Sequence, residues 1–169
     1  DAAVNLIAEF DETTVAILKH NNACGIASRN KVCEAWKDAL AGDPVSAFGG
    51  IIVSNRPIDA ETAEEINKIF FEIIIAPAYD EAALEILKQK KNRIILVQKD
   101  SPKSTIQFRS LLNGVLAQDK DLSVQKSEDL RLVTNRPLKA NEEQDLLFAN
   151  KLVKHTKSNA IILVKNKQL

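Results

Sequence analysis

The sequence predicts an α/β domain, in three α/β/α layers, with helices on both faces of a central sheet. Short runs of β-branched and aliphatic residues, typical of buried strands, alternate with longer segments that have apolar residues at helical spacing. Residues that break regular structure separate these segments: Gly42 follows an expected helix, and Pro77 stops an expected strand. The 169 residues suit one domain, whose core needs no disulfide or metal to fold.

The first half of the chain supplies most of the expected sheet. We expect strands at 13–18, 48–54, 73–77 and 93–97, and helices at 1–10, 31–41, 59–71 and 80–90. Residues 21–30 contain a glycine and are expected to form a loop. Asp59 is a favourable N-cap for the helix expected at 59–71, and Phe70 should face inward from that helix. Trp36 lies on the apolar stripe of its helix, so we expect it in the core.

The second half is more polar and less regular. We expect a connector at 101–104, then an irregular extended stretch over 106–118 that turns at Asn113-Gly114. Residues 119–138 are expected to form a surface excursion with a short strand at 130–133. A helix should run from Asn141 to about His155, followed by a final strand at 159–164.

Composition excludes several classes of function. Lys plus Arg and Asp plus Glu both number 23, so the formal charge is zero and no nucleic-acid footprint or charged membrane anchor is expected. The sequence has no apolar run of ~20 residues, and its first residues lack the basic and apolar regions of a signal peptide, so we expect neither a membrane span nor a secretory signal here. Two cysteines are too few for a disulfide scaffold, so we expect a reducing, cytoplasmic location. Because the chain has no methionine even at position 1, we expect it to be a segment of a longer protein.

The sequence also argues against metal and common nucleotide motifs. A zinc deaminase needs His-x-Glu followed later by Pro-Cys-x-x-Cys. Here His20 is followed by Asn21 and Asn22, and eight residues separate Cys24 from Cys33. We therefore predict no metal site and expect both cysteines to be small core or loop residues. Glycine-rich motifs for dinucleotides and nucleoside triphosphates are missing as well.

Lys19 and His20 follow the apolar run 15–18, so they stand at the end of an expected strand. Open α/β folds bind their ligands at such strand ends. An ammonium group held beside an imidazole disfavours the protonated ring, so His20 could act as a neutral base near pH 7. A solvated strand end is the alternative explanation of this pair.

Three other stretches hold residues that could face a ligand. Phe48 offers a flat apolar face beside Gly49 and Gly50, where a ligand or another backbone could approach closely. A tight turn explains the same glycines. Asn159, between a helix end and a strand, could face a ligand or cap a turn. Glu72 would be a surface carboxylate unless a donor approaches it.

Five stretches, taken together, resemble the AICAR formyltransferase/IMP cyclohydrolase family. They occur in the family's order, at 18–25, 43–50, 74–77, 116–119 and 157–160. This family transfers a formyl group from 10-formyltetrahydrofolate to the 5-amino group of AICAR, the aminoimidazole-carboxamide ribonucleotide. Its transferase region contains two cytidine-deaminase-like units without zinc. The resemblance implies that residues 1–169 are the first of these units.

The resemblance also implies catalytic roles for three residues. His20 would take a proton from the weakly nucleophilic 5-amino group. Lys19 would keep the imidazole neutral and help to bind the reacting groups. Asn159 would hold the formyl group and the oxyanion that develops during transfer.

Substrate binding is implied for Asn21, Phe48, Gly49 and Glu72. Phe48 and Gly49 would lie against the AICAR base, and Glu72 matches an acidic residue that contacts substrate. The formyl donor is the folate, and no metal is required. In the family the full-length protein is a homodimer whose active sites form where two subunits meet.

The chain departs from the family pattern in what it lacks. We find no cyclohydrolase domain, no Arg-Tyr-Gly-x-Asn-Pro-His-Gln segment and no second transferase unit, so we expect little or no turnover from this segment alone. Two alternatives stay open: a non-catalytic dimerisation or ligand-binding module, and an unrelated α/β enzyme that uses Lys19 and His20 differently. Convergence of Lys19, His20, Phe48 and Asn159 at one sheet edge would favour the transferase.

Overall fold

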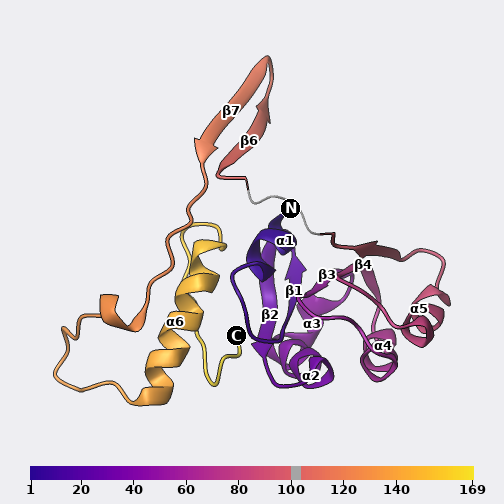
Figure 1. Ribbon diagram of the computed structural model, residues 1–169, viewed down its shortest axis with the longest axis horizontal. Helices are drawn as coiled ribbons and strands as arrows, with labels where there is room; N and C mark the ends of the chain where they lie inside the picture. The colour runs from indigo at the N-terminus through magenta and orange to yellow at the C-terminus, as the bar shows by residue number, and fades with distance from the viewer. Residues whose placement is uncertain (100–103) are drawn as a thin grey trace.

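The computed structural model describes residues 1–99 and 104–169, and within them a five-stranded sheet forms the centre of the fold (Figure 1). The strand order is β2-β1-β3-β4-β5. Strand β1 is antiparallel to both β2 and β3, whereas β3, β4 and β5 run parallel. The strands are β1 (Thr14–Lys19), β2 (Asn22–Ser28), β3 (Gly50–Ser54), β4 (Phe71–Ala76) and β5 (Ile94–Val97).

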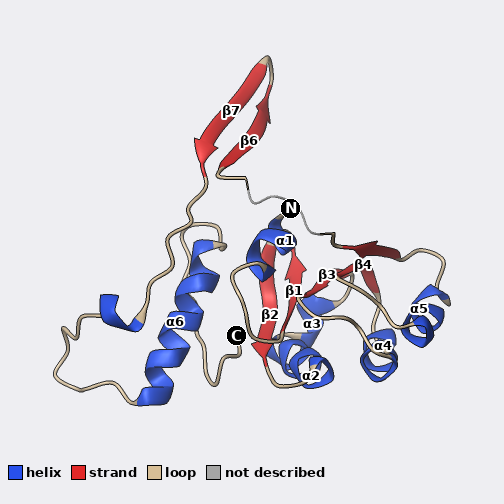
Figure 2. Cartoon of the chain, in the orientation of Figure 1, coloured by secondary structure: helices blue, strands red, loops and turns tan. Residues whose placement is uncertain are grey.

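Helices pack on both faces of this sheet, which confirms the predicted α/β class with its flanking helices (Figure 2). One face is covered by α2 (Val32–Gly42), α3 (Pro44–Ala47), α4 (Ala60–Asn67) and α5 (Glu81–Lys88). The other face is covered by α1 (Ala2–Ile7) and α6 (Ala140–Lys154). A short 3₁₀ helix, η1 (Ser127–Asp129), precedes α6.

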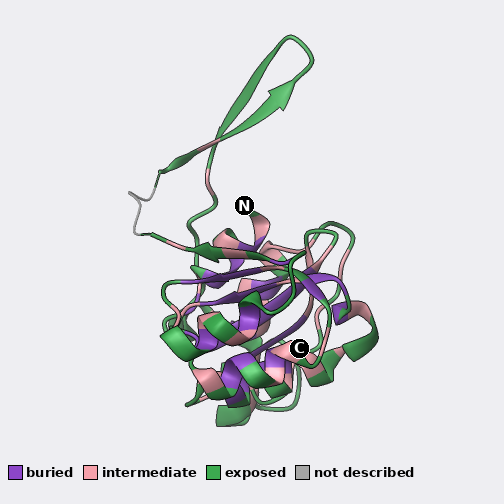
Figure 3. Cartoon of the chain, turned by 90° about the vertical axis from the view of Figure 1, so that its right-hand side faces the viewer, coloured by how far each residue is buried: buried purple, intermediate pink, exposed green. Residues whose placement is uncertain are grey.

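The central strands are buried on both sides, so their sequences read as continuous apolar runs. Alternate side chains of β1 enter different cores: Ile17 joins the core under α2–α5, and Leu18 joins the core under α1 and α6. Trp36 of α2 is 1% exposed, which confirms its predicted place in the core. Figure 3 shows the buried residues concentrated between the layers of this body.

Helix boundaries differ from the predictions by a few residues for identifiable reasons. Asp59 caps α4 as predicted, and its carboxylate accepts the Thr62 N–H at 2.8 Å. This helix ends at Asn67, and Phe70 therefore lies in the connection to β4, where it is 37% exposed. The predicted inward orientation of Phe70 from a helix is wrong, because Phe71 already belongs to β4.

The loop predicted at 21–30 is instead strand β2. His20 and Asn21 have φ values of +51° and +68°, and the residues that flank them, Lys19 and Asn22, pair across a hairpin. Two left-handed residues in a two-residue loop match the twist of antiparallel strands. The sequence hid this strand because small residues, including Gly25, replace the usual β-branched run.

Residues 106–119 form a regular hairpin rather than the irregular stretch that was predicted. Its strands, β6 (Ile106–Leu111) and β7 (Gly114–Asp119), pair antiparallel around a turn at Leu112 and Asn113, one residue before the predicted Asn113-Gly114. The hairpin projects away from the body (Figures 1 and 3). Most of the connector predicted at 101–104 lies outside the described residues.

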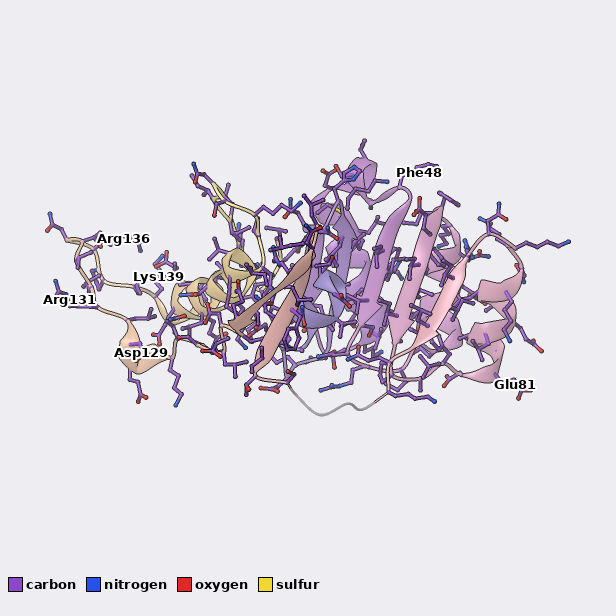
Figure 4. The ribbon with its side chains drawn as sticks, turned by 90° about the horizontal axis from the view of Figure 1, so that it is seen from above. Phe48, Glu81, Asp129, Arg131, Arg136 and Lys139 are labelled. Carbon is purple, nitrogen blue, oxygen red and sulfur yellow. The ribbon has the colours of Figure 1, made fainter. Side chains whose placement is uncertain are left out.

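Residues 120–139 lie largely at the surface, as predicted, but the strand predicted at 130–133 does not form. These residues follow η1 directly, and Leu132 and Val133 are exposed. Figure 4 shows Asp129, Arg131 and Arg136 at the opposite side of the molecule from Glu81 of α5.

The strand predicted at 159–164 does not form either. The outer edge of β2 is already occupied by residues that follow it: the Leu169 N–H donates to the Ile26 carbonyl at 3.0 Å, and the Ser28 N–H donates to the Lys167 carbonyl at 3.1 Å. Residues 159–164 do not take this place beside β2, and Ile161 is 89% exposed. In the part of the chain that is described, no helix is long and apolar enough to cross a membrane.

Candidate functional site

The candidate site lies at the end of the sheet where β1 ends and where β3 and β4 begin. Because β1 is antiparallel to β3, Leu18 pairs with Ile51, and the chain leaving β1 meets the chain entering β3. Gly50 of β3 pairs in turn with Phe71 of β4. Figure 4 shows Phe48, which lies two residues before β3, beyond the ends of these strands.

The Lys19 side chain joins two of the predicted stretches. Its ammonium group donates hydrogen bonds to the carbonyl oxygens of Phe48, at 2.7 Å, and Gly49, at 3.2 Å. Hydrogen bonds from a charged donor are stronger than those between neutral groups. Lys19 therefore holds the Phe48-Gly49 peptide against the end of β1.

His20 and Asn21 form the tip of the β1–β2 hairpin, and both are exposed. The histidine is thus accessible from solvent and is not enclosed by aliphatic side chains. Among the described residues, no hydrogen bond to the His20 ring is present, so its orientation is not fixed by a protein partner.

Phe48 and Gly49 form a turn with an exposed aromatic ring. Gly49 has a φ of +69°, a conformation that favours glycine, and its N–H donates to the Phe70 carbonyl at 2.8 Å. The Phe48 ring is 63% exposed and lies 5.3 Å, centroid to centroid, from the Phe70 ring. The turn alternative raised by the sequence is therefore correct, and the same turn presents an aromatic face.

Asn159 and Glu72 lie close to this end of the sheet without direct contact to the other candidates. The Lys157 N–H donates to the Asn22 side-chain oxygen at 3.3 Å, which brings the turn before Asn159 to the β1–β2 hairpin. Both Asn159 and Glu72 are exposed. Glu72 lies where the pairing of β3 with β4 shifts register, next to Gly50.

Sequence reasoning missed two residues behind this site. Phe70 supports Phe48 and Gly49, and Arg93 supports the segment that contains Phe70. One signal could have indicated Phe70, since an aromatic residue just before a parallel strand stands at the same sheet end as Phe48. Nothing in the sequence distinguishes Arg93 from the lysines that precede it in residues 88–93.

Other polar clusters lie elsewhere. A cleft of about 300 Å³ borders Phe10, Phe148 and Lys151 near the opposite end of β1, and no predicted site residue lines it. The Glu9 carboxylate contacts the C-terminal end of α6: it lies 2.7 Å from the Lys154 ammonium nitrogen and 2.9 Å from His155 Nε2. Lys154 and His155, which close α6, are thus occupied by a structural contact.

The cysteines and acidic groups do not form a metal centre in residues 1–99 and 104–169, where no three potential ligands gather. Burial raises the pKa of the Cys24 thiol, which donates to the Ile17 carbonyl at 3.4 Å. Burial is also the main cause of the raised pKa of Cys33. Both cysteines are free thiols in packed surroundings, as predicted.

The fold and the site together define a mixed α/β domain that presents a lysine, a histidine turn and an aromatic surface at one end of its sheet. The family described as AICARFT/IMPCHase bienzyme matches residues 1–169. The chain belongs to this family of bifunctional purine-biosynthesis enzymes.

Individual relatives support the same assignment. The chain is 64% identical over 169 residues to the bifunctional purine biosynthesis protein PurH of Bacteroides thetaiotaomicron, covering 100% of this chain and 33% of that protein. It is 48% identical over 172 residues to the PurH protein of Acetivibrio thermocellus, covering 99% of this chain and 34% of that protein. For the PurH protein of Caldicellulosiruptor saccharolyticus, identity is 47% over 169 residues, with coverage of 99% and 33%. The chain therefore spans about a third of the length of these relatives.

Proposed function

We propose that this chain contributes to the AICAR formyltransferase activity of its bifunctional family, as the first cytidine-deaminase-like unit of the transferase region. The substrates would be AICAR and 10-formyltetrahydrofolate, and no metal would be required. The family match and the mixed α/β architecture support this proposal. They leave open whether the region serves formyl transfer or the cyclohydrolase reaction, so the choice rests on the site.

One observation carries the choice. Three of the five stretches that resemble formyltransferases meet at one end of the sheet, although they are far apart in the sequence. Lys19 binds the Phe48 and Gly49 carbonyls, and Asn22 accepts a hydrogen bond from Lys157. A chance resemblance of separate stretches gives no reason for such direct contacts between them.

The proposed reaction assigns each group a step. The 5-amino nitrogen of AICAR attacks the formyl carbon, and the bond from that carbon to the folate nitrogen breaks. The amino group loses a proton to His20, and the folate nitrogen gains one as tetrahydrofolate leaves. Asn159 would donate to the formyl oxygen while negative charge develops there. A positioned base of this kind contributes about 10²–10⁴ in rate.

Recognition of AICAR would use the exposed surface beside Lys19. The Phe48 ring and the Gly49 peptide would lie against the base, while Asn21 and Glu72 would offer polar contacts. Lys19 would have two tasks in this proposal: it would stand near the imidazole of His20, and it would hold the peptide that contacts the base. The second task is supported by its hydrogen bonds to Phe48 and Gly49.

The site is open, so we propose that further protein completes it. Binding pockets for small molecules usually bury most of the surface of the ligand. The proposed site residues here are all exposed: His20, Asn21, Phe48, Glu72 and Asn159. The remaining length of the relatives and a second subunit are the two sources of that surface. We propose a homodimer of the full-length protein, acting in the cytoplasm.

The alternative of a non-catalytic interaction module is favoured by one feature. The strand alternation of the β6–β7 hairpin puts Ile106, Phe108, Val115 and Ala117 on one face, and all four are exposed. An isolated two-stranded hairpin is marginally stable in water, so this apolar face is suited to packing against other protein. An interaction role of the hairpin is compatible with catalysis at the candidate site, which contains no residue of the hairpin.

Calorimetric titration of AICAR tests the proposed function. The full-length protein should bind AICAR, the 169-residue chain alone should bind weakly or not at all, and the chain mixed with the rest of the transferase region should recover binding. Phe48→Ala in the full-length protein should weaken AICAR binding. If full-length protein bound AICAR with unchanged affinity after Phe48→Ala, this end of the sheet would not be the AICAR site.

A further inference from the structure

Phe70 contacts the Phe48-Gly49 turn through both its backbone and its side chain. Its carbonyl accepts the Gly49 N–H at 2.8 Å, and its ring lies 5.3 Å from the Phe48 ring with an angle of 47° between the planes. Tilted aromatic pairs at this separation attract each other beyond simple burial of area. The exposed Phe48 ring therefore has one aromatic neighbour that limits how it can rotate.

Gly49 is confined between this ring and Lys19. A β-carbon added at Gly49 would lie 3.0 Å from the Lys19 nitrogen and 3.6 Å from the Phe70 ring. The Lys19 ammonium holds the two carbonyls of the turn from one side, while Phe70 holds the Gly49 N–H from another. The peptide that would meet the AICAR base thus has its carbonyl and its N–H both engaged.

The segment that contains Phe70 is itself fixed by a buried arginine. Arg93, which is 9% exposed, donates to the Asn67 side chain at 2.7 Å and to the Ile69 carbonyl at 3.2 Å. Its guanidinium also lies 4.2 Å from the centre of the Phe71 ring, a cation–π distance. Contacts on both sides of Phe70 in the sequence, at Ile69 and Phe71, hold the connection between α4 and β4 in one position.

We propose that Phe70 is a positioning residue of the candidate site, which sets the orientation of the Phe48 ring and the Gly49 peptide for binding the AICAR base. Arg93 supports it by fixing the α4–β4 connection. This inference rests on the proposed function, since it takes AICAR as the ligand. It assigns Phe70 no contact with the reacting atoms, so its effect should reach AICAR only through Phe48 and Gly49.

The test is a double-variant comparison in the full-length protein, with AICAR affinity measured by calorimetry and transfer followed by steady-state kinetics. Phe70→Ala should raise the Kd and KM for AICAR about fivefold to tenfold, with kcat changed less than about threefold. Phe70→Tyr keeps the ring pair and should stay within about twofold of the parent protein. The double variant Phe48→Ala/Phe70→Ala should bind no more weakly than Phe48→Ala alone, because the Phe70 ring acts through the Phe48 ring, while the Phe70 carbonyl that accepts the Gly49 N–H is kept in Phe70→Ala.

Each outcome separates this inference from the function on which it rests. If Phe48→Ala weakened AICAR binding while Phe70→Ala left it unchanged, the positioning role would be overturned and the proposed function would stand. The inference would also be overturned if the two substitutions had fully additive effects on the free energy of AICAR binding. If the parent protein failed to bind AICAR, the proposed function itself would fail. Phe70 is partly exposed, so the variants should fold, and thermal unfolding checks this.

Discussion

Replacing Gly49 with alanine should destabilise the fold by about 2 kcal/mol, and the reason lies in one backbone angle. Gly49 has a φ of +69°, in the left-handed region where a β-carbon approaches its own backbone. The same residue presents its peptide to the proposed AICAR surface. The substitution therefore tests whether the turn has the conformation on which the site depends.

The magnitude follows from two contributions. The left-handed conformation costs a residue with a β-carbon about 1–2 kcal/mol. The new methyl group would lie 3.0 Å from the Lys19 nitrogen, and the flexible end of that side chain can move away. Its movement would weaken the hydrogen bonds to Phe48 and Gly49, at a cost of up to about 1 kcal/mol. The Phe70 ring, 3.6 Å away, makes an ordinary contact and adds little.

Urea unfolding of the 169-residue chain measures this cost, with Gly114→Ala as the matched control. A β-carbon at Gly114 would meet nothing within 4 Å, so that substitution should change stability by less than about 0.5 kcal/mol. Gly49→Ala should lower the melting temperature by about 4–8 °C, given about 2–4 °C per kcal/mol for a chain of this size. Equal stability of the two variants would refute the argument.

Two further substitutions test contacts outside the site. Glu9→Gln should destabilise the chain by about 1–2 kcal/mol in thermal unfolding at pH 7, because the Glu9 carboxylate, 14% exposed, holds Lys154 and His155. Burial raises the pKa of Glu9, but the hydrogen bonds and charges of these two partners outweigh burial and leave it below its usual range. The stabilisation by the ionised Glu9 carboxylate is therefore present above the ordinary glutamate pKa and is lost as the pH falls below about 4. If the parent chain stayed more stable than Glu9→Gln by the same amount down to pH 3, this reasoning would be contradicted. Asp59→Ala removes the cap that accepts the Thr62 N–H and should cost about 1 kcal/mol in urea unfolding, and no change would mean that the cap contributes nothing.

Strand and helix positions in the first half were largely predictable, because hydrophobic periodicity is strong there. The run 73–77 and the Asp59 cap each depend on neighbours in the sequence, and both predictions agree with the structure apart from boundary shifts. Strand β2 was missed because its signal lies in backbone angles at His20 and Asn21, which residue type alone does not fix. The predicted strand at 159–164 has the apolar residues of a strand, but residues 167 and 169 make the hydrogen bonds to the edge of β2 instead.

The candidate site was predictable only as a set of separate stretches. The sequence indicated that Lys19 and Phe48 stand near strand ends, but strand order and direction decide whether two ends meet. The hydrogen bond from Lys19 to the Phe48 carbonyl depends on β1 lying antiparallel beside β3. Phe70 could have been indicated only by its place just before a parallel strand, and the support from Arg93 could not be predicted, because it reaches a connection whose path is set by packing between layers.

Formyl transfer by the full-length protein carrying His20→Ala tests the central proposal most directly. Turnover with AICAR and 10-formyltetrahydrofolate should fall about 10²–10⁴-fold, while the Kd for AICAR stays within a few-fold of the parent value. His155→Ala is the matched control, because the other histidine of the chain is bound to Glu9 and lies outside the candidate site, and it should keep full turnover. Parent-like turnover from His20→Ala would contradict the account and remove His20 from the proposed chemistry.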